Sequence, residues 1–113
     1  MIVGVTTTPD GAVGGGLGRA QTVAVADVRD GEIAAWTEVA VGWGDLHGTE
    51  PEGTHHARIV RFVREHGLEC VVTSGLGAGM RTTMAKLGVV VRTDLVGEAR
   101  AAARTAGETP APR

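Results

Sequence analysis

Cysteine, tyrosine and long hydrophobic runs are scarce or missing in this sequence of 113 residues. Its single cysteine excludes an internal disulfide and any Cys-x-x-Cys metal or redox motif, and it fits a reducing compartment. Nowhere do 18 apolar residues run together, and the segment from Met1 to Val5 lacks the basic flank of a signal peptide. We therefore expect a cytoplasmic protein with no membrane partner.

The sequence also lacks a basic run. Eleven Lys and Arg stand against 13 Asp and Glu, which gives a net charge of -2 and no row of cations for phosphates. Nucleic acid is therefore not expected as a partner. A chain of this length fits one domain with its own core. We predict one domain over residues 1–106 and a flexible tail over residues 107–113.

Large aromatic side chains are few, whereas the apolar content is 42% and there are 18 glycines. The core must therefore be built from Val, Ala, Leu and Ile. The hydrophobic pattern predicts strands at 2–7, 22–28, 33–41, 68–73 and 89–93, with a tight Asp30-Gly31 hairpin turn and a long loop over 42–54. It predicts one helix from Gly53 or Thr54 to Gly67, one ending at Gly88, and one from Asp94 to about Ala106. The order β-β-β-α-β-α-β-α indicates an α/β fold with a mixed sheet.

Chain direction places several polar and glycine-rich segments at one edge of this sheet. If the first, third, fourth and fifth strands are parallel, their carboxyl ends share one rim, which is where ligands bind in open α/β sheets. Cys70 falls at the opposite end. The rim then carries Gly14 to Arg19, His47, His55, His56, Ser74 to Arg81, Thr93 and Asp94.

The segment Gly75-Leu76-Gly77-Ala78-Gly79 connects a strand to a helix amino terminus. Unpaired N–H groups and the helix dipole favour an anion there, and glycines let the backbone approach it. The segment is neither a P-loop nor a full Gly-x-Gly-x-x-Gly motif. The alternative interpretation is a tight strand–helix turn with no ligand.

Three of the four histidines lie in one short window, at His47, His55 and His56. Neutral imidazole is a common transition-metal ligand, but adjacent residues do not easily point the same way. The sequence therefore favours His47 with one of the other two as a pair. Two ligands are too few for a dedicated zinc site, so a capping or surface role stays open for each.

The sequence offers little for catalysis. Thr6, Thr7 and Thr8 stand where a metal-dependent nuclease would place carboxylates, and no Gly-x-Ser-x-Gly elbow occurs. We therefore do not expect an enzyme. An enzyme acting on a small anionic substrate remains an alternative, and it would need a rim histidine hydrogen-bonded to Asp10 or Asp94.

Several motifs together resemble the dinitrogenase iron-molybdenum cofactor biosynthesis family, which includes NifX, NafY and the carboxyl-terminal domain of NifB. The likeness covers residues 1 to about 105. It rests on Gly18-Arg19-Ala20, on Asp27 with the Asp30-Gly31-Glu32 hairpin, on His55-His56, and on Gly75-Leu76-Gly77-Ala78-Gly79-Met80.

The resemblance implies a ribonuclease H-like fold with sheet order 3-2-1-4-5. It also implies a non-catalytic carrier or accessory protein for an iron-sulfur or iron-molybdenum cluster, with cofactor-assembly proteins as partners. The family pattern usually has His-Phe-Gly-Arg-Ala, and Gly16 stands here in place of its histidine. The cofactor-binding residues expected on this basis are Gly18, Arg19, Gly75, Gly77, Ala78, Gly79, Met80 and Arg81, with His47, His55 and His56 as candidate metal ligands.

A second function fits the same fold. A regulatory or scaffold domain could have lost cluster binding and could use the rim, or an outer strand, to bind a protein partner. Gly16 and the loop from Gly14 to Gly16 favour this alternative. The sequence leaves the oligomeric state open.

Overall fold

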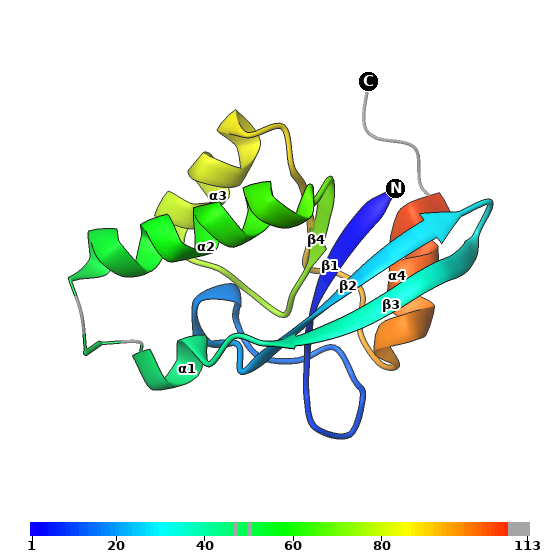
Figure 1. Cartoon of the computed structure of the whole chain (residues 1–113), viewed down its shortest axis with the longest axis horizontal. Helices are drawn as coiled ribbons and strands as arrows, with labels where there is room; N and C mark the ends of the chain where they lie inside the picture. The colour runs from blue at the N-terminus through cyan, green and yellow to red at the C-terminus, as the bar shows by residue number, and fades with distance from the viewer. Residues whose placement is uncertain (47, 50, 109–113) are drawn as a thin grey trace.

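The computed structural model describes residues 1–46, 48–49 and 51–108, with Glu52 described by its backbone alone. A mixed sheet lies at the centre, and helices cover both of its faces (Figure 1). The elements are β1 (Ile2–Thr7), η1 (Leu17–Arg19), β2 (Thr22–Arg29), β3 (Glu32–Ala40), α1 (Trp43–Leu46), α2 (Glu52–His66), β4 (Cys70–Val72), α3 (Ala78–Lys86), β5 (Val90–Arg92) and α4 (Ala99–Glu108).

The five strands lie in the order β3-β2-β1-β4-β5. Pairing is antiparallel between β1 and β2 and between β2 and β3, and it is parallel between β1 and β4 and between β4 and β5. The predicted α/β class, mixed sheet and strand order are confirmed. The ribonuclease H-like assignment stays a prediction.

The β2–β3 hairpin turns at Asp30 and Gly31, as predicted. Both residues have positive φ, 53° and 76°, and Arg29 pairs with Glu32 across the turn. A two-residue turn of this kind matches the right-handed twist of the strands, and it favours Asp-Gly because glycine adopts positive φ without strain.

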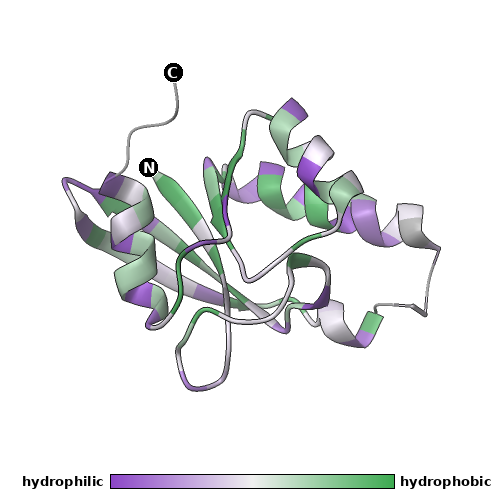
Figure 2. Ribbon diagram, turned by 180° about the vertical axis from the view of Figure 1, so that it is seen from behind, coloured by the Kyte–Doolittle hydropathy of each residue, from purple (hydrophilic) through white to green (hydrophobic). Residues whose placement is uncertain are grey.

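Two apolar clusters hold the layers together, one on each face of the sheet. Small alanines of α4 pack on one face against Val3, Val5 and Val72. On the other face, α2 and α3 contribute Ile59 and Met84 to a second cluster. Figure 2 shows hydrophobic residues along the strands and on the sheet-facing sides of the helices. The core is aliphatic, as the composition requires.

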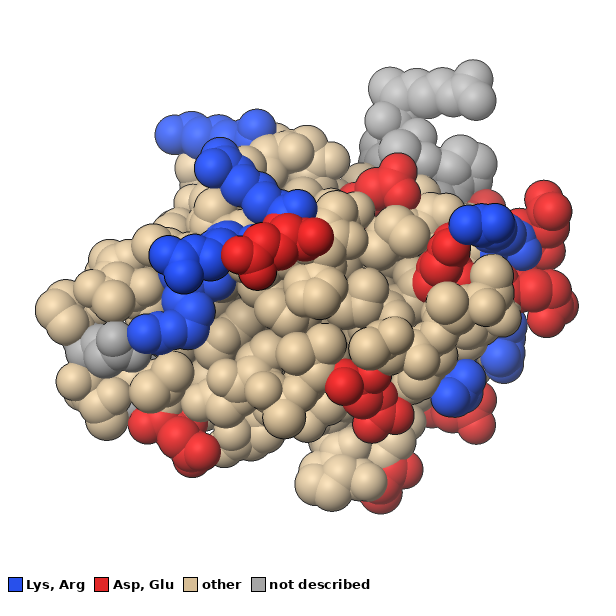
Figure 3. Space-filling view, in the orientation of Figure 1, with Lys and Arg blue, Asp and Glu red and all other residues tan. Residues whose placement is uncertain are grey.

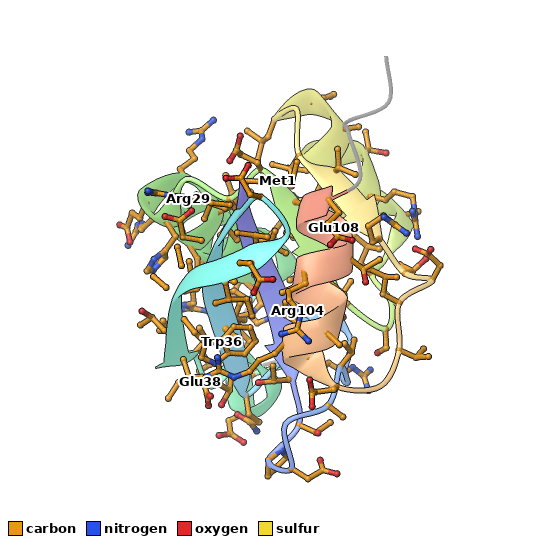
Figure 4. All side chains as sticks on the ribbon, turned by 90° about the vertical axis from the view of Figure 1, so that its right-hand side faces the viewer. Met1, Arg29, Trp36, Glu38, Arg104 and Glu108 are labelled. Atoms are coloured by element: carbon orange, nitrogen blue, oxygen red, sulfur yellow. The ribbon has the colours of Figure 1, made fainter. Side chains whose placement is uncertain are left out.

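Trp36 occupies the side of β3 that faces α4 (Figure 4). Its indole N–H donates to a Glu38 carboxylate oxygen at 3.0 Å, and the Arg100 guanidinium carbon lies 4.6 Å from the ring centroid. The second tryptophan, Trp43, is buried and packs edge-on against Phe62 at 5.2 Å between ring centroids. Neither indole lines the cavity described below.

Two features of the region between β3 and α2 differ from prediction. The expected loop over 42–54 contains the short helix α1, and α2 begins at Glu52 rather than after Gly53 or Thr54. Pro51 takes the N-cap position without a side-chain hydrogen bond. Proline lacks the N–H that would be unpaired at a helix start, so it can precede a helix without the usual capping side chain.

The last helix also begins later than predicted. Asp94 does not cap it, because its carboxylate pairs with Arg92 at 2.8 Å. Gly97 has φ of 86°, which no α-helix accommodates, and α4 starts only at Ala99. The helix continues through Gly107 and Glu108, which were expected in the tail; the rest of that tail lies outside the described residues.

The described residues contain no helix that is long and apolar enough to cross a membrane.

Candidate functional site

A cavity of about 530 Å³ lies at the predicted rim of the sheet, between η1, α2 and the loop that leads into α3. Seven of the candidate residues line it: Gly18, His55, His56, Gly77, Ala78, Gly79 and Met80. Gly48, Ile59 and Leu76 complete the lining. The sequence placed Leu76 at the rim without naming it as a binding residue, and it did not single out Gly48 or Ile59 for the site. Ile59 also belongs to an apolar core cluster, and no sequence signal marks a core residue that faces a cavity as well.

Three candidate residues lie outside the lining, and one cannot be placed. Arg19 and Arg81 are exposed, and neither lines the cavity. Gly75 contributes its carbonyl to the loop contacts described below rather than to the cavity wall. His47 lies outside the described residues.

Two buried threonines connect the two glycine-rich loops. Thr6 is the last buried residue of β1, and Thr73 is the residue that follows β4. Both side chains are fully buried. Their hydroxyl oxygens lie 3.0 Å apart, each lies 3.1 Å from the Gly15 carbonyl oxygen, and that of Thr73 lies 3.2 Å from the Gly75 carbonyl oxygen. The Leu17 N–H also donates to the Gly75 carbonyl at 2.9 Å. This network fixes the rim because buried polar groups must find partners inside the protein.

The glycines of the loop into α3 are not required by the fold. None of Gly75, Gly77 and Gly79 has positive φ. A Cβ atom built on any of the three would meet no heavy atom within 4 Å. The predicted alternative, that these glycines serve a tight turn, therefore has no conformational or steric basis here. Gly77 and Gly79, which line the cavity, leave open space beside the backbone there.

The amino terminus of α3 presents unpaired backbone donors at the same place. Its first helical hydrogen bond runs from the Arg81 N–H to the Gly77 carbonyl at 3.0 Å. Gly77 provides no side-chain cap. Within the described residues, the amides of Ala78, Gly79 and Met80 therefore have no protein acceptor. Such amides, with the dipole of a nine-residue helix behind them, favour an anion.

His55 connects α2 to η1. Its side chain is 9% exposed, and its Nε2 lies 2.7 Å from the Gly18 carbonyl oxygen. An Arg58 Nη1 lies 3.5 Å from its Nδ1. A carbonyl can only accept, so Nε2 carries a proton and donates it to Gly18.

His56 lies on the next position of α2 and contacts α3 instead. Its Nε2 is 2.8 Å from the Thr83 hydroxyl oxygen, which in turn lies 3.0 Å from the Gly79 carbonyl oxygen. The two adjacent histidines thus point to different elements, as expected for neighbours on a helix. Both still line the cavity.

Charge is distributed unevenly over the molecule. Figure 3 shows mostly Lys and Arg side chains over the α2–α3 part of the visible face, whereas acidic and basic side chains are mixed toward the β2–β3 hairpin and acidic ones lie along the lower edge. The two helices α2 and α3, which wall the cavity, carry more basic residues than acidic ones: Arg58, Arg61, Arg64, Arg81 and Lys86 against Glu52 and Glu65. The positive helices favour an anionic ligand in the cavity.

Asp10 and Asp94, the carboxylates that an enzyme would need beside a rim histidine, have other hydrogen-bond partners. Asp10 accepts a hydrogen bond from the Thr8 hydroxyl, which lowers the pKa of its carboxyl. Asp94 accepts two hydrogen bonds from Arg92, which lower the pKa of its carboxyl to about 2. Both side chains are therefore held as ionised surface groups.

The described residues of the site do not offer the ligand set of a resident metal ion. Within the described part of the chain, no three His, Cys, Asp or Glu side chains are grouped to hold a metal ion. Cys70 is buried at the other end of β4, and burial raises the pKa of its thiol to about 11. The rim offers instead the backbone amides at the start of α3 beside an open cavity, an arrangement that suits an anion.

Comparison with known proteins adds a family and a fold. A sequence model described as "Dinitrogenase iron-molybdenum cofactor" matches residues 1–108. No curated protein sequence matches the chain. The crystal structure of PH0822 superposes with a TM-score of 0.71 at 22% identity, over 95% of this chain and 89% of that one. The NMR structure of TM1290, a NifB-like protein of the DUF35 family from Thermotoga, gives 0.68 at 22% identity, over 95% and 87%. At this identity the two structures show the fold alone.

Proposed function

This chain belongs to the dinitrogenase iron-molybdenum cofactor family, and from that premise we propose that it is a non-catalytic carrier or accessory protein. Its cargo is an anionic iron-sulfur or iron-molybdenum cluster, held in the cavity at the rim. The observation that carries the proposal is the group of three unpaired amides at Ala78, Gly79 and Met80, facing a space that the neighbouring glycines leave open.

Binding by backbone amides suits a cluster that must be transferred to another protein. Backbone amides at a helix amino terminus bind an anion by charge and hydrogen bonding, without the covalent hold of several thiolates. Cys70, the single cysteine of the chain, lies away from the rim. Binding should therefore be exchangeable, with cofactor-assembly proteins as donor and acceptor.

The test is anaerobic incubation of the pure protein with ferrous iron and sulfide, followed by desalting, absorption spectroscopy and iron counting. We expect the wild type to retain iron with the absorption of an iron-sulfur cluster. A well-folded wild-type protein that keeps no iron after desalting would contradict cluster carriage.

Gly79→Ala separates binding from folding. Gly79 is the second residue of α3 and lines the cavity, and an added Cβ meets no protein atom. We expect α3 to gain up to about 1 kcal/mol, because alanine is the better helix former. Retained iron should nevertheless fall severalfold, because the methyl group occupies the space proposed for the cargo. Thermal unfolding and iron counting measure the two effects.

Gly53→Ala is the matched control. Gly53 is also the second residue of its helix, α2, it has no neighbour within 4 Å of a built Cβ, and it does not line the cavity. It should stabilise the protein to a similar extent without changing iron retention. Equal loss of iron in both variants would show that the effect does not come from the cavity.

The alternative function, a scaffold that binds a protein partner and no cluster, is favoured by one observation. Strand β3 is nine residues long and lies at the outer edge of the sheet, where its free backbone groups can pair with a strand of another chain. If the folded wild-type protein retains no iron, we propose this second function instead.

A further inference from the structure

The two adjacent histidines of the cavity differ in how their ring nitrogens are used. His55 donates from Nε2 to the Gly18 carbonyl, and its Nδ1 lies within reach of an Arg58 N–H. Both of its nitrogens therefore face protein groups. His55 is a structural link between α2 and η1.

The ring of His56 is held in one tautomer by a relay of two hydrogen bonds. The Thr83 hydroxyl has one proton, and a carbonyl can only accept, so the 3.0 Å contact with Gly79 places that proton toward the Gly79 oxygen. The Thr83 oxygen must then accept from the ring, so the proton of the neutral imidazole is on Nε2. Nδ1 keeps its lone pair.

Among the residues that the structure describes, none donates a hydrogen bond to this lone pair of His56 Nδ1. Within the described residues, Thr83 is the one hydrogen-bond partner of the His56 side chain, and it contacts Nε2. His56 is only partly buried and lines the cavity beside Gly77 and Gly79. A metal-ligating histidine typically has this arrangement, with one nitrogen held by a hydrogen-bond acceptor and the other available to the metal.

We propose that Nδ1 of His56 coordinates a metal atom of the cargo and that Thr83 is the positioning residue that keeps this nitrogen deprotonated. The inference rests on the proposed function and names the protein ligand within it. It assigns different roles to two neighbouring histidines that the sequence does not distinguish. It also explains how one imidazole can hold a cluster that the amides of α3 bind by charge.

The relay can be tested on the protein without cargo. Long-range ¹⁵N–¹H correlation spectra at about pH 8, where an ordinary imidazole is neutral, report which ring nitrogen carries the proton. We expect His56, assigned by its loss in His56→Gln, to be protonated on Nε2. Thr83→Val should produce a mixture of tautomers, and Thr83→Ser, which restores the hydroxyl, should return the single form. A His56 ring protonated on Nδ1 would overturn the relay.

The ligand can be tested on protein loaded anaerobically with ferrous iron and sulfide. In protein with ¹⁵N-labelled histidine, pulsed electron paramagnetic resonance of the reduced cluster should show a coupled nitrogen. The coupling should disappear in His56→Gln, whose amide keeps a donor for Thr83. Thr83→Val should lower iron affinity about tenfold or more, as loss of an outer hydrogen bond to a metal-ligating histidine does, and Thr83→Ser should restore it.

The possible results distinguish a failure of the role of His56 from a failure of the proposed function. Iron retained with no coupled nitrogen, or with a coupling that survives in His56→Gln, overturns the role of His56 while cluster carriage stands. No iron in the folded wild type overturns both. His55→Gln is the control: a coupling that persists in it supports His56, and a coupling lost only in it assigns the ligand to His55 and overturns the proposal.

Discussion

Glycine is required at some positions of this chain by its backbone conformation or by close packing, and at other positions neither reason applies. Gly97 has φ of 86°, so a residue with a Cβ would be strained there. Gly107 lies against β2, where a Cβ would come within 2.4 Å of a Val28 methyl carbon. Gly16 differs from both, because its backbone is extended, with φ of -74° and ψ of 156°, and the nearest atom to a built Cβ is the Gly75 carbonyl oxygen at 3.5 Å.

Gly16→His should therefore fold normally and bind more cargo. The family pattern that this chain resembles has a histidine at the corresponding position. An imidazole at residue 16, on the loop joined to Gly75, would add a ligand at the rim. We expect the iron retained after anaerobic loading to rise severalfold over wild type, with the thermal unfolding midpoint nearly unchanged.

Gly16→Gln provides the comparison of similar size without an imidazole. Its iron retention should match that of the wild type. If Gly16→His folds and retains no more iron than Gly16→Gln, the side chain at this position does not reach the cargo, and the scaffold alternative gains support.

At the scale of elements, the rim depends on a small polar network between β1 and β4. Thr73→Val keeps the volume of the side chain but removes a fully buried hydroxyl that contacts Thr6, Gly15 and Gly75. We expect the free energy of unfolding to fall by about 1–2 kcal/mol, because buried acceptors lose a donor. Denaturant unfolding measures it.

Two further variants check the origin of this loss. Thr82→Val removes an exposed hydroxyl that donates to the Ala78 carbonyl, and it should change stability by less than about 0.5 kcal/mol. Thr6→Val with Thr73→Val should cost less than the sum of the two single changes, because the hydroxyls contact each other. Additive losses would show that the two threonines act independently.

The strands were predictable from the sequence because their β-branched runs end at clear turn residues. The parallel pairing of β1, β4 and β5 also agrees with the strand directions expected, and it brings the carboxyl ends of these strands to one edge. The helix starts were less predictable. Capping rules look for a polar side chain, whereas α2 follows Pro51 and α4 starts after Gly97.

The roles of the two histidines could not be predicted in the same way. They are decided by which groups of distant elements lie opposite each ring: the Gly18 carbonyl for His55 and the Thr83 hydroxyl for His56. Tertiary packing fixes these pairings, and neighbouring residues in the sequence carry no signal for them. The same holds for Ile59, which belongs to the core and also lines the cavity.

At the scale of the whole molecule, the cavity and the single thiol lie toward opposite ends of the sheet. The cavity lies at the carboxyl ends of the strands, whereas Cys70 begins β4, pairs with Val3 and Val90, and is 1% exposed. A reagent reaches this thiol only when the sheet opens. The single cysteine is therefore a reporter of global unfolding.

We expect Cys70 in the native protein to react with an aromatic disulfide reagent no faster than the chain unfolds, and to react at once in denaturant. Burial in the sheet raises the pKa of the thiol from 9.0 to about 11, with a smaller lowering by Arg92. The folded state thus keeps a proton that the unfolded chain releases near pH 9. The stability from this group is fully present below that pH and is lost as the pH rises through about 11.

Cys70→Ala removes the titrating group, so the free energy of unfolding of this variant should fall less steeply between pH 9 and 11 than that of the wild type. The quantity to compare is the change in the free energy of unfolding with pH, because the packing lost in Cys70→Ala lowers the stability of the variant at every pH. Rapid stoichiometric labelling of the native protein would show instead that the sheet opens locally at β4. Such opening would also weaken the rim, since Thr73 directly follows this strand and holds both glycine-rich loops.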